Sequence, residues 1–561
     1  MTVTPVRDRR ALMGIETEYA LVGLAPDGRP LSRGKLASRL LFLAQGELCN
    51  LAAGGTDKGL FLANGARFYI DVGSHPEFCT PECMDPREVV RYVSAGDRIL
   101  EMLATQMERK NPGLEKLMLF RNNVDYSGSR NTWACHESYH MRPGPRTLAD
   151  EWLIPHLVSR IIYAGGGGFD SCSPGLEFVL SPRAPHMVRE TTECSTGDRG
   201  ILHSKDEPLA AHGSRRLHLL CGDSLCSHTA SWLKLGTTAL VVRLVEAGIR
   251  PGLDYPLRHV LGALRTFSGD LTCRTTVRLE NGEGVTAVEI QRRILRVVEQ
   301  RLDIMPEWAP AVVAAWRHVL GRLENDPKGL DATLDWRIKH ALYVAHSKQR
   351  GIARGRWGML SNIARYLHSR YVELDEPAAP FRETVLDRRG ELASQVRGVL
   401  REMSRYEVDL EQLEAFLDLR DQLFEIDSRF AQIGPDGIFN ALDRAGVLDH
   451  AVAGMGDIDR ATQKPPFRGR ARARGDAILE ASRSRPSEVF CAWDCIKDFA
   501  KSKVLDLSDP FEEHPSWRPS GNDGRGDQRL SRVPLIQAEA SETAFNVAAT
   551  IRRLMEGERW R

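Results

Sequence analysis

The chain has 561 residues, of which 42% are hydrophobic and 27% charged, as is typical of a soluble globular protein with more than one domain. Its 76 Lys and Arg residues balance 75 Asp and Glu residues, so it lacks the overall basic field of many nucleic-acid-binding proteins. No run approaches the roughly 20 apolar residues that a membrane helix needs, so we expect neither nucleic acid nor a membrane as a partner.

The first 235 residues or so read as short strands separated by Gly, Pro, Asn and Asp. The first strand, in GIETEYALVG, places Glu16 and Glu18 on one face and Ile15 and Tyr19 on the other. Neighbouring carboxylates repel each other unless they face water or share a cation. Magnesium binds through oxygen ligands, often carboxylates together with nucleotide phosphates, which suits this pair.

The most informative segment is residues 64–83, NGARFYIDVGSHPEFCTPEC. As a strand it points Arg67, Tyr69 and Asp71 to one side, and Glu77 follows on a turn within reach of the same cavity. A cation, a phenol and a carboxylate in a row can hold a phosphate, assist a metal ion and move a proton. The alternative interpretation is a solvated strand face with incidental charges. The opposite side is a predicted apolar core face made of Ala66, Phe68, Ile70 and Val72.

Two later strands repeat this pattern. In CHESYHMR, His136 and His140 alternate with Glu137, and in RRLHLLCGD, Arg216 and His218 alternate with leucines. A lone histidine in such a strand is more often a hydrogen-bonded core or surface residue than a ligand. Several strands with polar faces nevertheless predict a curved sheet whose concave side is a polar cleft.

The chain has no Walker A motif, GxGxxG loop or GxSxG nucleophile elbow. The four glycines at 165–168 lack the Lys-Ser/Thr pair that follows in a phosphate-binding loop, so they are interpreted as a flexible turn. An ATP site in this chain would therefore lie on the sheet, with metal ions and arginines binding the phosphates.

Helical patterns dominate after residue 233. One segment has an apolar face that includes Leu240 and Leu244 and ends at Gly248, and others are predicted at 286–301, 309–323 and 334–345. Residues 350–420 are helical in character, with a break at 377–380. Residues 512–528 resemble a linker, and a last helix is predicted at 541–556.

Eleven cysteines are spread along the chain, an odd number that favours reduced thiols and a cytoplasmic location. The pairs Cys79/Cys83 and Cys491/Cys495 have CxxxC spacing, whereas structural zinc sites usually contain two CxxC-type knuckles. Buried, unreactive thiols are the favoured interpretation.

Several long blocks of the sequence resemble, in order, those of the Pup ligase and depupylase (Pup deamidase) family. They include MGIETEYALVG, FLANGARFYIDVGSHPEFCTPEC, FRNNVDYSGSRNTWACHESYH, KDEPLAAHGSRRLHLLCGDS and WLKLGTTALVVRLVEAG. Looser matches continue through PPFRGRAR and VFCAWDCIKDFAKSKVLDLSDPF, so that the resemblance covers most of residues 11–511. This family shares its fold with glutamine synthetase.

The resemblance implies an α+β fold with a large glutamine-synthetase-like domain, in which helices pack on a curved antiparallel sheet, and a small C-terminal domain. We expect the large domain at 1–440, with a helical insertion at about 343–420. The small domain is expected at 441–511, and a linker with a C-terminal helical extension at 512–561.

The resemblance also implies roles for individual residues. Asp71 would be the catalytic base, and His136, Glu137, Arg216 and His218 would lie in the cleft without assigned roles. Magnesium would be held by Glu16, Tyr69 and Glu77, and ATP by Arg67, Thr80 and Trp493.

The implied reaction begins when ATP phosphorylates a carboxylate, the C-terminal glutamate side chain of Pup or a Pup-like modifier. Magnesium and Arg67 would neutralise the charge on the transferring phosphoryl group. A lysine amine of a target protein is protonated near neutral pH, so Asp71 would remove a proton before the amine attacks. Proteasome-pathway components are further expected partners.

The ligase is favoured over the depupylase because only 47 residues separate Glu16 from Asn64, where depupylases carry a long extra loop. The family's DEPHAD is DEPLAA here, so Leu209 replaces a histidine, and the insertion and tail also depart from the pattern. Modifier hydrolysis, a small-substrate ligase and a catalytically inactive adaptor therefore remain alternatives. The intact Arg67, Tyr69, Asp71 and Glu77 argue against the adaptor.

Overall fold

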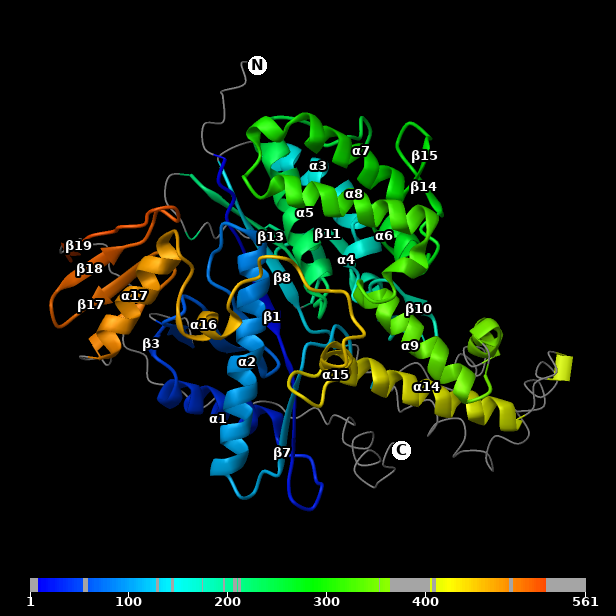
Figure 1. The fold of residues 1–561 in the computed structure, drawn as a ribbon, viewed down its shortest axis with the longest axis horizontal. Coiled ribbons are helices and arrows are strands. Elements are labelled where there is room, and N and C mark those ends of the chain that lie inside the picture. The colour runs from blue at the N-terminus through cyan, green and yellow to red at the C-terminus, as the bar shows by residue number, and fades with distance from the viewer. Residues whose placement is uncertain are drawn as a thin grey trace.

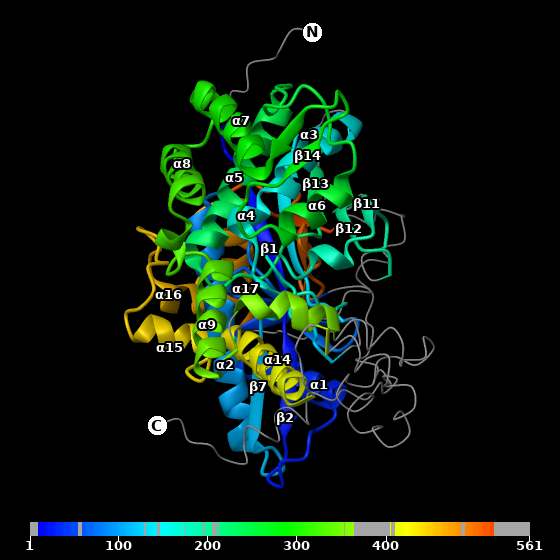
Figure 2. The ribbon, with the colours of Figure 1, turned by 90° about the vertical axis from the view of Figure 1, so that its right-hand side faces the viewer.

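The computed structural model describes residues 9–520 except 54–58, 128–130, 143–145, 174, 195–196, 205–208, 210–212, 353, 364–403, 406–409 and 484–487. Most of the predicted helical insertion lies outside the described residues, as does the predicted helix at 541–556. Figures 1 and 2 show the arrangement of the described elements in two perpendicular views.

A nine-stranded sheet forms the centre of the molecule, in the order β11-β12-β13-β8-β1-β6-β5-β4-β3. Neighbouring strands are antiparallel, except that β11 and β12 are parallel. The predicted α+β class, with a mainly antiparallel sheet, is therefore confirmed. The strands are β1 (Met13–Glu18), β3 (Asn50–Ala52), β4 (Leu60–Leu62), β5 (Arg67–Asp71), β6 (His75–Cys79), β8 (Cys135–Met141), β11 (Arg189–Thr192), β12 (Gly200–His203) and β13 (Arg215–Leu219).

Helices pack against one face of this sheet. The apolar side chains of β1, β8 and β13, such as Ile15, Tyr139 and Leu217, are buried in the same core as α3 (Arg146–Ser159) and α5 (His228–Glu246). Phe68 of β5 and Phe78 of β6 pack with α1 (Arg33–Glu47) and α2 (Pro86–Lys110). The other face of the sheet is thereby left to the polar side chains.

The predicted helices after residue 233 are confirmed at closely similar positions. Helix α5 extends from His228 to Glu246, and Gly248 follows with a positive φ of 70°, as a glycine at a helix end often does. Helix α7 begins with a capping box between Thr286 and Glu289. The other long helices of this part are α6 (Val260–Gly269), α7 (Ala287–Gln300), α8 (Ala309–Asn325), α9 (Asp335–Gln349) and α14 (Leu410–Phe430).

A second, four-stranded sheet lies at the C-terminal end of the described chain, in the order β16-β17-β18-β19. Its first strand adjoins the edge of the large sheet, because Cys491 forms a bridge with Ala53 next to β3. Figure 1 shows this sheet and α17 at the left, away from helices α6, α7 and α8. These elements are α16 (Ile458–Gln463), α17 (Arg470–Ser482), β16 (Val489–Cys491), β17 (Cys495–Asp498), β18 (Lys503–Asp506) and β19 (Trp517–Pro519).

Several smaller elements complete the fold. Strands β2 and β7 form a two-stranded sheet beside α2, and Figure 2 shows α9 and α14 below the cluster of helices that covers the large sheet. The remaining elements are β2 (Ala20–Leu24), β7 (Lys116–Phe120), α4 (Ile161–Ala164), β9 (Gly168–Phe169), β10 (Phe178–Val179), β14 (Thr276–Arg278), β15 (Gly284–Thr286) and α15 (Ile438–Arg444).

Two expectations about individual segments were wrong. The interpretation of 512–528 as a linker fails in its first part, because Trp517–Pro519 pair with β18 as strand β19. Val72 was expected on the apolar core face, but β5 ends at Asp71, and Val72 lies in the following turn with 68% of its surface exposed. Separately, none of the described helices is long and apolar enough to span a membrane.

Candidate active site

Five adjacent strands, β13, β8, β1, β6 and β5, present polar side chains on one face of the large sheet. The register places Glu16 opposite both His136 and Cys79, and Cys79 opposite Arg67. Residues paired directly across neighbouring strands point to the same side. The predicted alternation is confirmed, and one face carries Glu16, Glu18, Arg67, Tyr69, Asp71, His75, Glu77, Cys79, His136, Arg216 and His218.

Three carboxylates crowd together at the centre of this face. Glu18, Asp71 and Glu77 each have an oxygen within 4.8 Å of the others. Burial, and then the neighbouring carboxylates of Glu16, Glu18 and Asp71, raise the pKa of Glu77 well above its usual value. Burial and then Glu18 also raise the pKa of Asp71. The crowding of negative charge suits a divalent cation, which would relieve it.

Glu18 is the one member of this group whose pKa is lowered. Burial alone would raise it, but His75, with Nδ1 at 3.3 Å from the carboxylate, His136 and the backbone of Ala134 together more than offset that effect. The backbone N–H of Ala134 also donates a hydrogen bond to Glu18 at 2.7 Å. Glu18 is therefore held as an anion between two fixed donors.

Glu16 lies in a second group with a different composition. Its carboxylate forms an ion pair with Arg216 and lies 3.6 Å from Nδ1 of His136 and 3.4 Å from Nε2 of His218. Burial would raise the pKa of Glu16, but Arg216 and the histidines lower it well below its usual value. Burial, and then Arg216, lower the pKa of His218 to about 4, so its ring is neutral at neutral pH. A carboxylate with two imidazoles can serve as a set of metal ligands.

Among the described residues, these two groups are the sets of three or more His, Cys, Asp or Glu side chains that could hold a metal ion, and neither contains a cysteine. Cys79 and Cys83 are buried, and burial raises the pKa of both thiols well above the usual value. Their burial and the raised pKa of their thiols agree with the interpretation of Cys79 and Cys83 as unreactive thiols.

The edge of the polar face toward the small C-terminal sheet is aromatic and cationic. The guanidinium of Arg67 lies 4.4 Å from the ring centre of Tyr69 and 5.6 Å from that of Phe61. The Phe61 ring in turn contacts Trp493 edge-on, with 5.2 Å between ring centres. Trp493 lies between β16 and β17, so the small sheet and the large sheet both contribute to this edge.

Tyr69 and Thr80 were also predicted as site residues. Tyr69 lies on the polar face, and Thr80 lies just beyond the end of β6. Tyr69 is paired with Glu77 across the β5–β6 ladder, and burial, then Cys79 and Glu77, raise the pKa of its phenol well above its usual value. Thr80 is only 3% exposed, and its hydroxyl accepts a hydrogen bond from the backbone N–H of Ile15 at 3.1 Å. A contact of Thr80 with a nucleotide stays a prediction.

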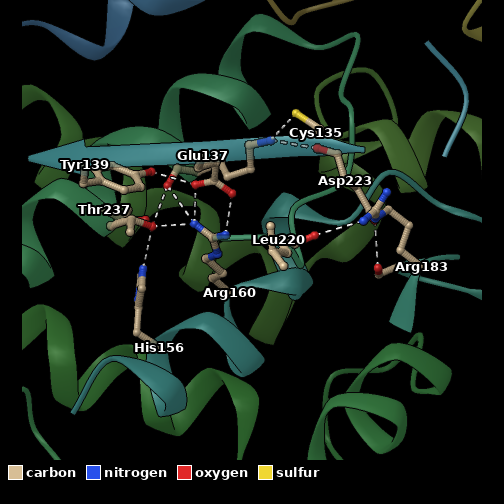
Figure 3. Close-up of polar contacts among 12 residues, drawn as sticks. Cys135, Glu137, Tyr139, His156, Arg160, Arg183, Leu220, Asp223 and Thr237 are labelled. Atoms are coloured by element: carbon tan, nitrogen blue, oxygen red, sulfur yellow. Dashed lines mark hydrogen bonds and ion pairs between the residues drawn. The ribbon is translucent and has the colours of Figure 1, made fainter. Parts of the chain in front are cut away.

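Glu137 was expected in the cleft, and this expectation was wrong. It alternates with His136 and so points to the opposite face of β8, where it is fully buried (Figure 3). Both of its oxygens bind Arg160, at 2.6 and 2.8 Å, and Tyr139 donates a further hydrogen bond at 2.6 Å. The sheet's two-residue period decides this orientation.

The four glycines at 165–168 were interpreted as a flexible turn, but all four are buried. A Cβ on Gly165 would lie 2.2 Å from the carbonyl oxygen of Leu180, and one on Gly167 would lie 2.5 Å from Trp336. Lys339 also donates a hydrogen bond to the carbonyl of Gly167 at 3.0 Å. The glycines therefore allow close packing of the backbone rather than flexibility.

Several residues near the polar face were not assigned from the sequence. His75 and Cys79 could have been found, because they alternate with the apolar Phe78 along β6 in the same way as Glu77 does. Glu82, which binds Arg470 and Arg474 of α17, had no such signal, because its partners lie almost 400 residues away in the chain. Only the packing of the small domain brings these residues together.

The chain is similar to known proteins over nearly its whole length. The family model for "Pup-ligase protein" matches residues 11–396 and 403–497. A Pup–protein ligase of Xylanimonas cellulosilytica is 33% identical over 520 residues, which cover 90% of this chain and 97% of that protein. A Pup–protein ligase of Kineococcus radiotolerans is 38% identical over 347 residues, which cover 60% of this chain and 74% of that protein.

Two solved structures share the fold. One is the crystal structure of the complex between the prokaryotic ubiquitin-like protein Pup and its ligase PafA, with a TM-score of 0.67, 25% identity, and 92% of this chain and 91% of that chain covered. The other is the Pup ligase PafA in complex with ADP, with a TM-score of 0.60, 25% identity, and 85% of this chain and 91% of that chain covered.

Proposed function

The chain belongs to the Pup-ligase family and is an ATP-dependent carboxylate–amine ligase, and we propose that it joins Pup or a Pup-like small protein to lysine amines of target proteins. The bond formed would be an isopeptide bond between the C-terminal glutamate of the modifier and a lysine amine of the target. The observation that carries this proposal is the crowding of carboxylates, histidines and arginines on one face of the sheet.

The donor set on this face fits magnesium. Glu18, Asp71 and Glu77 offer oxygen ligands so close together that the pKa values of Asp71 and Glu77 are raised. We propose that Glu77 of this group holds magnesium together with Tyr69, its partner across the β5–β6 ladder, and with Glu16 of the second group. Bound there, magnesium would neutralise negative charge on the phosphates of ATP.

The nucleotide would bind at the edge where the two sheets meet. Arg67, held over the ring of Tyr69, offers its guanidinium to the phosphates, and Trp493 offers an aromatic surface beside Phe61. Thr80 at the end of β6 would complete the contacts. Arg67 would stabilise the charge that develops as the γ-phosphoryl group moves from ATP to the modifier's carboxylate.

Asp71 is the proposed catalytic base. It is half-buried on the polar face, and its raised pKa makes it a better proton acceptor than an ordinary aspartate. The lysine ammonium gives a proton to Asp71, and the neutral amine attacks the acyl phosphate. The C–N bond forms as the C–O bond to phosphate breaks, and the second proton of the amine leaves with the phosphate.

The expected partners follow from this reaction. They are the modifier, lysine-bearing target proteins, and proteasome-pathway components that would receive the conjugates. The PafA structure with Pup supports a Pup-type modifier for this chain. We propose that the reaction takes place in the cytoplasm, where ATP is available and cysteines stay reduced.

The test is ligation by purified protein supplied with ATP, magnesium, a Pup-like modifier and a lysine-bearing acceptor. ADP release and a covalent adduct on a gel are expected, and Asp71→Asn should lower the rate of adduct formation by about 100-fold or more. Asp476→Asn is the matched control, because Asp476 is an exposed aspartate on α17. Cleavage of a preformed conjugate without any adduct would contradict the ligase and favour the hydrolase.

A further inference from the structure

Glu82, just beyond the end of β6, is bound by two arginines of helix α17 in the small C-terminal domain. Nε of Arg470 donates to Glu82 at 2.7 Å, and the guanidinium of Arg474 donates to both carboxylate oxygens, one of them at 3.2 Å. The Arg474 side chain is completely buried and that of Arg470 is 5% exposed. We call Glu82, Arg470 and Arg474 the Glu82 clamp.

The clamp carries a net positive charge, because two guanidinium groups bind one carboxylate. Burial would raise the pKa of Glu82, but Arg474 and then Arg470 lower it to about 2, so Glu82 is an anion at any physiological pH. The second positive charge is not paired with a second carboxylate by these contacts. Nη1 of Arg470 and both terminal nitrogens of Arg474 donate to backbone carbonyls instead.

These carbonyls come from segments far apart in the sequence. Arg474 donates to the carbonyl of Gly65 at 3.0 Å and to that of Trp493 at 3.2 Å. Arg470 donates to the carbonyls of Leu507 at 3.0 Å and Leu209 at 2.5 Å. Two guanidinium groups therefore fix four backbone segments around one buried carboxylate.

Two of these segments carry the residues proposed to bind the nucleotide. Gly65 is in the β4–β5 turn, two residues before Arg67, and α17 approaches this turn so closely that a Cβ on Gly65 would lie 3.1 Å from the carbonyl of Ala471. Arg474 also lies 4.8 Å from the ring centre of Trp493. The clamp thus contacts the backbone on both sides of the Arg67–Trp493 edge.

A third segment carries the substitution noted in the DEPLAA block. Leu209 has a positive φ of 48°, which is uncommon for a residue with a side chain, and its carbonyl is held by Arg470. Such backbone conformations persist where surrounding contacts enforce them. The clamp therefore also holds the backbone of Leu209, which precedes β13 in the chain.

We propose that Glu82, Arg470 and Arg474 are positioning residues that hold Arg67 and Trp493 in the arrangement that binds ATP. This inference rests on the proposed ATP site. The alternative is an ion pair that only joins the two domains, which would affect folding but leave nucleotide affinity of the folded protein unchanged. The carbonyl contacts at Gly65 and Trp493 favour the positioning role, because they act on the backbone of the nucleotide site itself.

The first variant is Arg474→Lys, which keeps the positive charge but loses the planar fork that reaches Glu82, Gly65 and Trp493 together. We expect its dissociation constant for a fluorescent ADP analogue with magnesium, and its KM for ATP, to rise about tenfold, while kcat at saturating ATP changes less than about threefold. Arg472→Lys is the matched control, because Arg472 lies on the same helix and is 46% exposed. Its affinity should equal that of the wild type.

A double-mutant cycle separates positioning from stability. If the clamp acts through Trp493, Arg474→Lys should weaken ADP binding much less in a Trp493→Ala background than in the wild type. Equal weakening of ADP binding in both backgrounds would overturn the proposal, and so would an unchanged KM for ATP in the single variant. A fall in kcat alone would also overturn it, since it would indicate a smaller fraction of folded enzyme.

Two further results keep the test decisive. If Arg474→Lys does not fold by circular dichroism, Glu82→Gln takes its place, because it keeps the shape of the side chain and removes the charge that orients both arginines. If the wild type itself does not bind the ADP analogue, the proposed ATP site fails. If the wild type binds and every folded clamp variant binds equally well, the clamp proposal alone fails.

Discussion

Buried glutamates on the two faces of the large sheet have pKa values that are shifted in opposite directions. On the covered face, Glu137 and Arg160 form a bidentate ion pair that is almost completely buried, and the pKa of Glu137 is lowered because Arg160, Lys234 and Tyr139 together more than offset the effect of burial. On the polar face, Glu77 is also buried, but its pKa is raised, first by burial and then by its charged neighbours, which are carboxylates. A buried glutamate paired with a protein cation has its charge balanced within the fold, whereas one crowded by other anions favours binding of a cation from solution.

The largest effect is expected on the covered face. Glu137→Gln should lower the free energy of unfolding by about 3–5 kcal/mol, because it leaves the Arg160 guanidinium buried without its anion. Chemical denaturation measures this loss. Glu299→Gln is the control, since the Glu299 pair with Arg317 lies at the surface and should contribute little. Equal effects of the two substitutions would show that the buried pair is not structural.

A glutamate-to-glutamine substitution on the polar face should instead raise the free energy of unfolding. The raised pKa of Glu77 means that, as the pH rises through that native value, ionised Glu77 increasingly destabilises the folded state. Glu77→Gln removes this ionisation, so in magnesium-free buffer at neutral pH the variant should be more stable than the wild type.

Magnesium sharpens this prediction. It should raise the melting temperature of the wild type, because it binds the folded state, and raise that of Glu77→Gln much less. Differential scanning calorimetry with and without magnesium measures both differences. A destabilised Glu77→Gln variant, or an equal gain from magnesium in both proteins, would contradict the role of this face as a cation site.

The smallest effect is expected at the end of β5. Val72→Ser should change the free energy of unfolding by less than about 0.5 kcal/mol, because Val72 is largely exposed in the turn. Phe68→Ala, four residues earlier on the covered face, should lower it by about 3–5 kcal/mol, because the Phe68 side chain is only 1% exposed. Denaturation curves of both variants test whether the covered face ends before Val72.

Much of the fold could be predicted from local patterns. Helices α7, α8 and α9 lie close to the segments predicted from apolar spacing, α7 also begins with a capping box, and the apolar segment near Leu240 forms α5. The local sequence pattern did not predict where strands begin and end. A turn began at Val72, and Trp517–Pro519 joined a sheet although their surroundings resemble a linker. Strand ends depend on the partner strand, which local sequence does not specify.

The sequence by itself determined that Arg67, Tyr69 and Asp71 share one side of a strand, and that Glu16 shares a side with Glu18, because side chains alternate with a period of two. The same rule would have excluded Glu137 from the cleft, since it neighbours His136.

Only the tertiary structure decided which strands are neighbours. The register of β1 with β6 brings Glu18 beside Glu77, and the docking of α17 brings Arg474 to Glu82. These contacts join residues that are distant in the chain, so their charges interact only after the sheets and helices have packed. The displaced pKa values of Asp71 and Glu77, and with them the affinity expected for a cation, are therefore properties of the fold.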